Sequence, residues 1–266
     1  QVLFLDANGH ILYAALAVAG LVPAPAEQLA PGEQSVLLLV DAGCGEGLAQ
    51  LLNSRRFMLR VQAQVRPDLQ VAGAIGDGVQ KLADVVKNLV TTWRDPWPGI
   101  TPGGSTYFTG TRHPGANYRA GGVVVALEAG QTAPGQEQAP GQEPGQAPAA
   151  GELIQAGDLT QVGELAWEAL RIEAGLPRWA REVDARAIPN ELDWLRTGVH
   201  LNKGCYPGQE TIARTVNLGR PPRRLVQLQL AGWQGQLPEV GARVYLPVGD
   251  NPAGKAVGTI TSVARH

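Results

Sequence analysis

The chain has 266 residues, is 44% hydrophobic and 17% charged, and carries a formal net charge of −2. This composition is typical of a globular protein, and no apolar run is long enough for a membrane span. The near-zero net charge gives no sign of an overall nucleic-acid-binding surface, although a local basic patch stays possible. Two cysteines are too few for a disulfide scaffold and indicate a reducing compartment, so we expect a cytoplasmic protein. The apolar stretch 11–26 lacks a basic flank and contains Pro23 and Pro25, so we do not expect a secretory signal.

The first 130 residues are predicted to combine short strands with two helices. A hairpin is expected around the turn sequence Asp-Ala-Asn-Gly, since Asn-Gly tolerates positive φ. One predicted helix follows Gly47, with Leu48, Leu51 and Leu52 on one face, and another covers 79–93, where apolar residues recur at helical spacing. The predicted strands cover residues 2–5, 11–18, 35–41, 57–65, 71–75 and 121–127.

The second half begins with a low-complexity stretch, residues 131–151, which lacks the apolar surface needed to offset ordering entropy and is predicted to be disordered. A helix over 160–174 is expected to start after Asp158 as cap and to stop at Gly175. Another short helix should run from Gln209 to about 216. The tail is strand-rich, with predicted strands at 224–230, 242–247 and 256–263.

The stretch LLLVDAGCGEG, residues 37–47, places Asp41 and three glycines between a strand and a helix. It resembles the nucleotide-binding loop of S-adenosylmethionine-dependent methyltransferases, in which glycines let backbone N–H groups approach a ligand at a helix N-terminus. The next strand does not end in an acidic residue, and no regular strand–helix alternation follows. We therefore favour a simple strand-to-helix turn and keep the methyltransferase as an alternative.

The most specific motif is NKGCYPGQETIAR, residues 202–214. Its Lys-Gly-Cys-Tyr-x-Gly-Gln-Glu core, followed by Ala-Arg, resembles the signature of the YgfZ-like folate-binding family, relatives of the aminomethyltransferase T-protein of glycine cleavage. LRIEAGLPRW (170–179) resembles the helix-ending segment of that family, and IPNE (188–191) the loop before the signature. FLDANGHILYAAL, RRFMLRVQAQV and VGTITSV match further segments, so that the resemblance covers most of the chain except 131–151.

The resemblance implies an α+β fold with three small domains in a cloverleaf around a channel that holds a reduced folate. We assign residues 1–41 with 152–220 to a discontinuous folate-binding domain, 42–130 to a ferredoxin-like domain, and 221–266 to a C-terminal β-barrel. The family usually has further segments before the hairpin and after the last strand, so we expect the barrel to be incomplete.

The resemblance also implies a site. Glu191 would be the pterin-binding carboxylate, since a carboxylate can accept two parallel N–H bonds from a pterin edge. From the residues alone, Glu191 is either a solvated loop residue or a buried hydrogen-bonding group. The other folate-binding candidates are the indole Trp194, a stacking partner for the pterin, and the signature residues Lys203, Tyr206, Gln209, Glu210 and Arg214.

Cys205 is the candidate reactive thiol. Gly204 and Gly208 permit a sharp turn that would present it, and Lys203 would favour its thiolate form. The alternative is a buried small residue in a tight turn. No cysteine and histidine cluster has metal-ligand spacing, so we predict no metal site.

Five arginines admit two interpretations. Arg171 and Arg214 could reach a glutamyl tail, but we favour internal ion pairs with Glu173 and Glu210. Arg220, Arg223 and Arg224 form a basic cluster that we interpret as a solvated patch, with an anionic tail or partner as the alternative.

The chain departs from the T-protein at one important point. Tyr13 and Ala14 stand where that enzyme has acidic residues on the strand after its early hairpin, so the acid/base group for folate chemistry is missing. The resemblance therefore implies a tetrahydrofolate-binding protein that supports iron–sulfur cluster enzymes and tRNA modification, with folate and iron–sulfur enzymes as partners. A folate-dependent aminomethyltransferase of glycine cleavage, the methyltransferase above and a structural adaptor remain alternatives.

Overall fold

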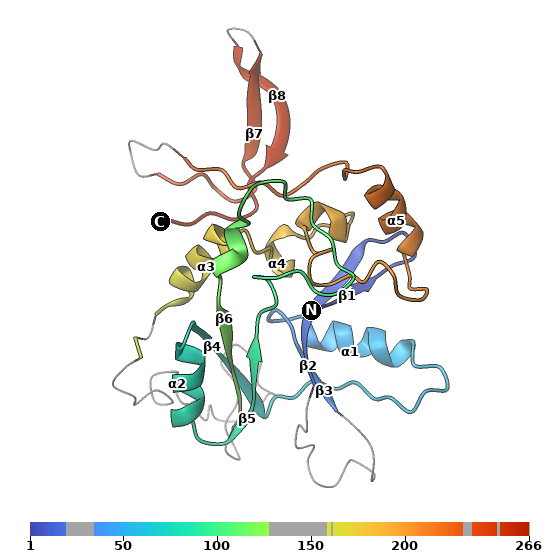
Figure 1. Ribbon diagram of the computed structural model, residues 1–266, viewed down its shortest axis with the longest axis vertical. Helices are drawn as coiled ribbons and strands as arrows, with labels where there is room; N and C mark the ends of the chain where they lie inside the picture. Colours follow the sequence, from blue (N-terminus) through green and yellow to red (C-terminus); the bar gives the residue numbers. More distant parts are fainter. Residues whose placement is uncertain (20–34, 128–158, 161, 231–235, 249–250, 266) are drawn as a thin grey trace, which may run out of the picture.

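A computed structural model describes residues 1–19, 35–127, 159–160, 162–230, 236–248 and 251–265. Over these residues the chain mixes helices with two three-stranded sheets and a two-stranded hairpin (Figure 1), which confirms the α+β class. The low-complexity stretch 131–151 and the predicted helix cap Asp158 lie outside the described residues.

The first sheet is antiparallel, with the order β1-β2-β3. β1 (Val2–Leu5) and β2 (Ile11–Ala19) form the predicted hairpin, and β3 (Val36–Leu39) pairs on the far edge of β2. The Asp6 carboxylate fixes the turn by accepting hydrogen bonds from the backbone N–H groups of Asn8 and His10, each at 2.8 Å. Helix α1 (Gly45–Ser54) follows and buries Leu48, as its apolar spacing predicts.

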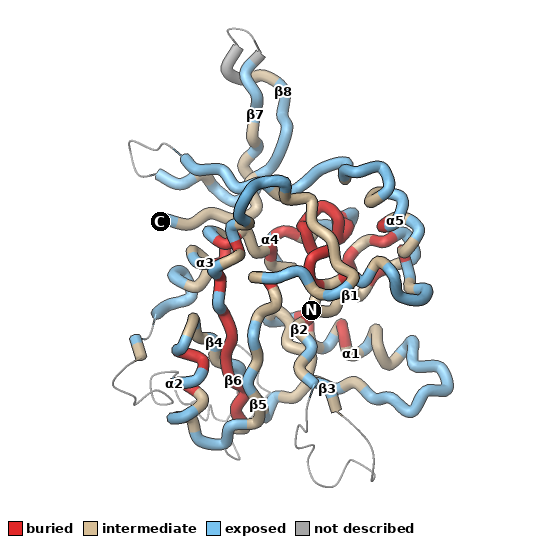
Figure 2. The backbone as a smooth tube through the Cα atoms, viewed as in Figure 1, coloured by how far each residue is buried: buried red, intermediate tan, exposed pale blue. Residues whose placement is uncertain are grey.

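The second sheet has the order β4-β6-β5 and is also antiparallel. Its strands are β4 (Leu69–Ile75), β5 (Leu89–Arg94) and β6 (Ala120–Ala126), and helix α2 (Gly78–Val85) packs on it through Leu82. The central strand, β6, is buried along nearly its whole length, because α2 and the two outer strands enclose it (Figure 2).

Two predicted elements of this half are wrong. The helix expected over 79–93 ends at Val85, because Asn88 adopts a left-handed backbone (φ +56°) and the β-branched Thr91 and Thr92 then pair with β6. The strand expected over 57–65 is an irregular, mostly exposed segment without a paired strand. Apolar alternation alone does not make a strand when no edge is available for pairing.

The segment before β6 and the C-terminal half are irregular between short helices. Their elements are η1 (Pro114–Asn117), α3 (Glu164–Glu173), α4 (Trp179–Glu182), η2 (Pro189–Leu192), α5 (Gln209–Asn217), β7 (Arg243–Val248) and β8 (Asn251–Thr259). Helix α3 starts four residues later than expected, because Gly163 is extended and acts as its N-cap; it ends at Gly175 (φ +63°), as predicted.

The predicted β-barrel is not confirmed. Residues 224–230 form no strand, and β8 ends at Thr259, short of the expected 263. In the part of the chain that the structure describes, β7 and β8 pair only with each other and no sheet closes on itself (Figure 1). Barrel closure needs a continuous ring of paired strands, so the cloverleaf and its division into three domains stay predictions.

The most buried segment among the described residues is a loop. All residues from 187 to 197 are buried, although only η2 has regular structure there (Figure 2). Buried backbone carbonyls need hydrogen-bond donors, and distant segments supply them. The backbone N–H of Ile11 donates to the Ala187 carbonyl (2.9 Å), and that of Leu225 donates to the Glu191 carbonyl (2.8 Å). The N–H groups of Thr101 and Ser105 donate to the carbonyls of Arg196 (2.8 Å) and Leu195 (3.0 Å).

Side-chain hydrogen bonds also hold this buried loop in place. Asp193 takes a left-handed backbone (φ +56°), and its carboxylate accepts hydrogen bonds from the Thr106 hydroxyl (2.7 Å) and the Tyr107 N–H (3.0 Å). His113 Nε2 lies 3.4 Å from the same carboxylate. The loop 105–113 is thereby fixed against the buried loop.

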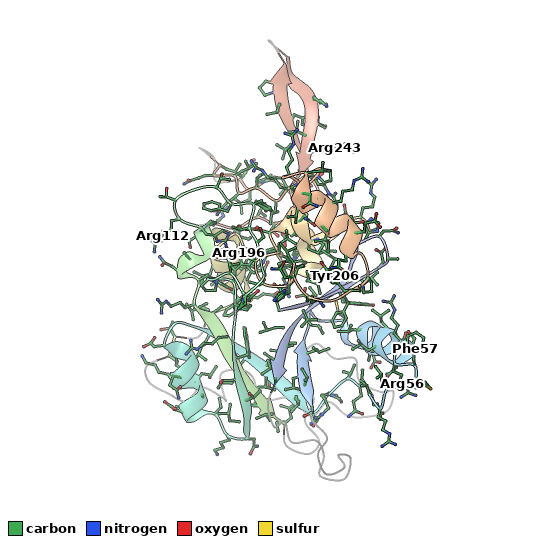
Figure 3. The ribbon with its side chains drawn as sticks, turned by 45° about the vertical axis from the view of Figure 1, so that its right-hand side comes forward. Arg56, Phe57, Arg112, Arg196, Tyr206 and Arg243 are labelled. Carbon is green, nitrogen blue, oxygen red and sulfur yellow. The ribbon has the colours of Figure 1, made fainter. Side chains whose placement is uncertain are left out.

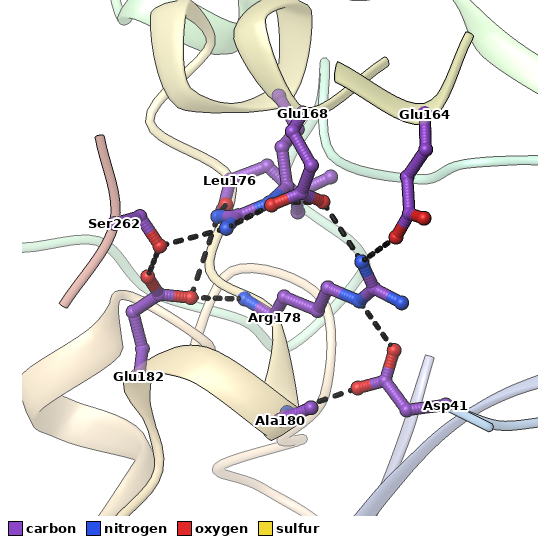
Figure 4. Close-up of polar contacts among 9 residues, drawn as sticks. Asp41, Glu164, Glu168, Leu176, Arg178, Ala180, Glu182 and Ser262 are labelled. Carbon is purple, nitrogen blue, oxygen red and sulfur yellow. Dashed lines mark hydrogen bonds and ion pairs between the residues drawn. The ribbon is translucent and has the colours of Figure 1, made fainter. Parts of the chain in front are cut away.

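A buried ionic network joins three further parts of the chain (Figure 4). Arg171, 3% exposed, donates to Glu168 at 2.6 and 2.9 Å, to Glu182 at 3.3 Å and to the Ser262 hydroxyl at 2.7 Å. The expected internal pairing of Arg171 is thus confirmed, but its partners are Glu168 and Glu182 and not Glu173. The network ties α3 to α4 and to the C-terminal segment.

Arg178 extends this network to the first sheet. Its guanidinium donates to Glu168 (2.9 Å) and to Asp41 (2.6 Å), and the Asp41 carboxylate also accepts from the backbone N–H of Ala180 (3.0 Å). Asp41, at the end of the first sheet, therefore serves as a structural link in the folded chain (Figure 4).

We expect Arg171→Ala to lower the free energy of unfolding by about 3–5 kcal/mol, because it leaves Glu168 and Glu182 with less compensation for their buried charge. Urea denaturation followed by tryptophan fluorescence measures this change. Arg181→Ala, at an exposed position of α4, is the control and should change stability by less than about 0.5 kcal/mol. Equal losses in the two variants would contradict the role of the network.

Candidate functional site

The signature forms a turn that leads into helix α5, as predicted. Gly208 is the N-cap in a left-handed conformation (φ +77°), and the carbonyl of Tyr206 accepts a hydrogen bond from the N–H of Gln209 at 3.2 Å. Ile212, fully buried, anchors the helix in the main core. Asn190 then connects this helix to η2, since its side-chain amide donates to the Ile212 carbonyl at 3.3 Å.

The turn also packs against the first hairpin at backbone contact. A Cβ atom at Gly208 would lie 2.3 Å from the Cα of Gly9 and 2.5 Å from its nitrogen. Gly9 is itself left-handed (φ +85°). The signature glycine is thus required for the close approach of two turns. Gly204, by contrast, has open space around its Cβ direction.

We expect Gly208→Ala to destabilise the protein by about 1–3 kcal/mol or more, because it adds left-handed strain and a steric clash. Thermal unfolding followed by circular dichroism measures the loss. Gly204→Ala, four residues away in the same signature, should leave the midpoint nearly unchanged, and a larger loss at Gly204 than at Gly208 would refute this reading of the turn.

Cys205 is exposed, so its interpretation as a packed small residue is wrong. The buried cysteine is Cys44, where burial raises the pKa of the thiol. The ammonium of Lys203 lies 4.8 Å from the centroid of the Tyr206 ring, a cation–π arrangement. Among the described residues, no group of three or more His, Cys, Asp and Glu side chains is arranged to hold a metal ion.

Glu191 lies in the buried loop and is 5% exposed. Of the two interpretations from the sequence, a solvated loop residue or a buried hydrogen-bonding group, the second therefore holds. Its Oε2 accepts hydrogen bonds from Arg223 Nε (2.9 Å) and from the Ile188 N–H (3.4 Å). No hydrogen bond from another described residue reaches Oε1. Burial raises the pKa of the Glu191 carboxyl, an effect that the hydrogen bond from Arg223 only partly offsets.

Arg223 is the site residue whose role the sequence did not predict. Its guanidinium donates to both carboxylate oxygens of Asp184, at 2.6 and 2.7 Å, while Nε holds Glu191. The hydrogen bonds from Arg223 lower the pKa of Asp184 to about 2. Arg223 is exposed, as its interpretation as part of a solvated patch expects, but it also pairs with Glu191; a basic residue 32 positions from Glu191 gave no local signal of this pairing.

The remaining candidates divide between core and surface. Trp194 is 1% exposed and packs in the main core, where its Nε1 finds no hydrogen-bond partner among the described residues. Tyr206 and Gln209 are half-buried. Lys203, Glu210 and Arg214 are exposed on the signature turn and on α5. Figure 3 shows Tyr206 near the middle of the molecule, between the chain's first hairpin and α5.

Two cavities lie outside these candidates. One, of about 230 Å³, is lined by Arg94, Asp95, Pro98, Ala116, Arg119 and Ala120. The other, of about 490 Å³, is lined by Leu12, Tyr13, Gly47, Gln50, Leu51 and Ser54. Glu191 and Cys205 line neither of the two. What joins the Glu191 loop to the signature helix is the contact of Asn190 with Ile212.

The methyltransferase alternative loses its structural basis. β3, the strand before the glycines, pairs antiparallel with β2, so the glycine loop does not lie at the carboxyl edge of a parallel sheet. The acidic residue of the motif, Asp41, is bound to Arg178 and Ala180. The glycines form the strand-to-helix turn that we favoured.

The raised pKa of Glu191 predicts a pH dependence of stability. The native state binds this proton more tightly than the unfolded state, so the favourable contribution is complete below the ordinary value of 4.5 and is lost as pH rises through the native pKa. Wild type should therefore lose stability relative to Glu191→Gln over that interval. Urea midpoints of both proteins across this pH range test it; a difference that grows in favour of wild type would contradict it.

Comparison with known proteins identifies related sequences. No protein-family model matches the chain. Over 86 residues it is 38% identical to the tRNA-modifying protein YgfZ of Klebsiella pneumoniae (strain 342), 40% to that of Enterobacter sp. (strain 638) and 38% to that of Escherichia coli (strain K12 / DH10B). The match covers 32% of this chain, and it spans about a quarter of the length of these relatives, 26% of each.

In the described residues, no helix has the length and apolarity to cross a membrane.

Proposed function

We propose that this chain binds tetrahydrofolate and acts in tRNA modification by supporting iron–sulfur enzymes. The premise is its similarity to the YgfZ proteins, which supports a YgfZ-like family. The names of the relatives support the link to tRNA modification. The folate ligand and the iron–sulfur partners come from the family resemblance of the signature, and the geometry around Glu191 makes the folate part testable.

The observation that carries the proposal is the buried carboxylate of Glu191. An ionised carboxylate in a protein interior is expensive unless it is paired. Here one oxygen is held by Arg223, and no described residue donates to the other. The pterin edge of a folate offers two parallel N–H donors, which match both oxygens of a carboxylate.

Arg223 can release Glu191 when a pterin binds, because it has a second carboxylate partner. Its guanidinium is half-exposed and already makes its shorter hydrogen bonds to Asp184. When a pterin takes the Glu191 carboxylate, Arg223 keeps Asp184 as its counter-ion. The pterin is neutral, so its two N–H groups replace the hydrogen bond from Arg223 but not its positive charge, and the Glu191 carboxylate is then stabilised by hydrogen bonds alone.

Cys205 takes a different role in the proposal. Its exposed position on the signature turn allows a second molecule to reach the sulfur. One thiol cannot hold an iron–sulfur cluster alone. Any cluster chemistry would therefore take place with a partner protein docked at the signature turn.

Aminomethyl transfer is the less supported function. Tyr13 stacks on Trp179, with ring centroids 5.7 Å apart, and offers no carboxylate. Asp184 is an acid connected to Glu191 through Arg223, but a pKa of about 2 makes it a poor proton acceptor at neutral pH. The function of a folate-binding support protein therefore agrees better with these residues.

Calorimetric titration with tetrahydrofolate tests the proposal. Wild type should bind, and Glu191→Gln should weaken binding at least tenfold, because each lost charge-assisted hydrogen bond contributes about 1.5–3 kcal/mol. Glu239→Gln, at an exposed glutamate near β7, is the control with the same charge change and should bind like wild type. No heat with wild type, or equal binding by Glu191→Gln, would overturn the proposal.

A further inference from the structure

The segment after α1 is a solvent-exposed loop of basic and apolar residues. We call residues 55–61, RRFMLRV, the arginine loop. Phe57 is 89%, Met58 99% and Leu59 68% exposed, and the guanidinium groups of Arg55, Arg56 and Arg60 belong to the same loop. Figure 3 shows Arg56 and Phe57 at the outer edge of the molecule, well away from Tyr206.

The arginine loop has a fixed base. The Asn53 side chain donates to the Ala63 carbonyl at 2.7 Å and accepts from the Ala63 N–H at 3.0 Å, so a single amide closes the loop like a paired strand residue. Within the loop, the N–H of Leu59 donates to the carbonyl of Arg56 at 2.8 Å. Phe57 adopts φ +46°, a left-handed conformation that is unusual for a bulky residue. The structure thus maintains a strained turn that exposes an aromatic ring.

The loop is also electrostatically uncompensated. No acidic residue occurs between Glu46 and Asp68, and Asp68 is paired with Arg66 at 2.6 Å. Within the described chain, none of the three guanidinium groups of the loop forms an ion pair. A chain with a net charge of −2 therefore carries a local patch of three positive charges around exposed apolar side chains.

A cavity adjoins the loop along α1. Gly47, Gln50, Leu51 and Ser54 recur at helical spacing and line the cavity of about 490 Å³, with Leu12 and Tyr13 opposite. Helix α1 ends at Ser54, and the next residue is Arg55. This cavity is shallow and open to solvent, and it offers an amide and hydroxyls beside apolar groups.

We propose that the arginine loop and the adjoining cavity form a binding surface for single-stranded RNA. The three arginines contact phosphates, Phe57 stacks on an unpaired base, and the α1 cavity accepts a neighbouring base whose edge is read by Gln50. Unpaired nucleotides are recognised by this combination of positive charge, aromatic stacking and polar groups at base edges. The choice of RNA rests on the proposed function in tRNA modification and deepens it, because transfer RNA exposes unpaired loops.

An anionic membrane surface is the competing ligand for such a loop. Stable membrane attachment needs a large apolar surface or two independent anchors. The loop offers three apolar side chains on an irregular backbone, and a lipid surface gives no role to the polar cavity beside it. The cavity and the interleaved arginines therefore favour RNA.

Fluorescence anisotropy of a short labelled single-stranded oligoribonucleotide, titrated with the full chain over a range of salt concentrations, tests the proposal. Unlabelled transfer RNA, a double-stranded RNA and phosphatidylserine vesicles serve as competitors. The variants are Arg55→Gln/Arg56→Gln/Arg60→Gln, Phe57→Ala and Gln50→Ala. The control, Arg112→Gln/Arg119→Gln/Arg243→Gln, removes three exposed arginines elsewhere, two of which are labelled in Figure 3.

The expected results are specific. Wild type binds the oligoribonucleotide, and transfer RNA competes better than double-stranded RNA. In the triple loop variant, the slope of log affinity against log salt concentration becomes shallower by about two, since each phosphate contact contributes about 0.7 for single strands. Phe57→Ala weakens binding about tenfold, and Gln50→Ala about two- to tenfold. The control triple variant keeps the affinity and slope of wild type.

Three outcomes would overturn the proposal: no RNA binding by wild type, equal binding by the two triple variants, or binding of the vesicles alone. Tetrahydrofolate calorimetry on the same triple loop variant separates this proposal from the proposed function. Folate binding should be unchanged, because the loop is remote from Glu191 in sequence and makes no contact with it. RNA binding that fails while folate binding persists contradicts the RNA surface only.

Discussion

The buried loop from residue 187 to 197 is the constraint on which the rest of the structure depends. It has almost no regular structure, so its carbonyl groups must find donors elsewhere, and they find them in three segments that lie far apart in the sequence. The first hairpin, the loop after β5 and the segment before residue 225 are all positioned by this requirement. Asp193 adds the loop that carries His113.

The ionic network around Arg171 and Arg178 supports this centre from the outside. It joins α3, α4, the end of the first sheet and the segment at Ser262 through ion pairs and hydrogen bonds (Figure 4). Glu191 therefore projects from a backbone that is held on several sides. A carboxylate on such a rigid support is preorganised, and binding a planar ligand there costs little conformational entropy. The signature helix is joined to the same support through Asn190 and Ile212.

Local patterns in the sequence predicted the parts of the fold that depend on local chemistry. The hairpin turn, the apolar face of α1, the stop at Gly175 and the start of α5 at Gln209 all follow from spacing and turn residues. The buried loop has no periodicity, so no pattern predicts its burial. The ion pair between Arg223 and Glu191 depends on tertiary contacts that the sequence does not show. At 57–61, apolar residues suggested burial, whereas the structure exposes them. The motif resemblance predicted the family, which the relatives support, and it predicted site roles that remain to be measured.

The central claim is that the buried carboxylate at position 191 receives the pterin of a reduced folate. A crystal structure of the chain with tetrahydrofolate tests it most directly. The account predicts both Glu191 oxygens within hydrogen-bond distance of the pterin N–H groups, with Arg223 displaced from Glu191 and still bound to Asp184. Folate bound elsewhere, with the Arg223–Glu191 contact unchanged at 2.9 Å, would contradict the account.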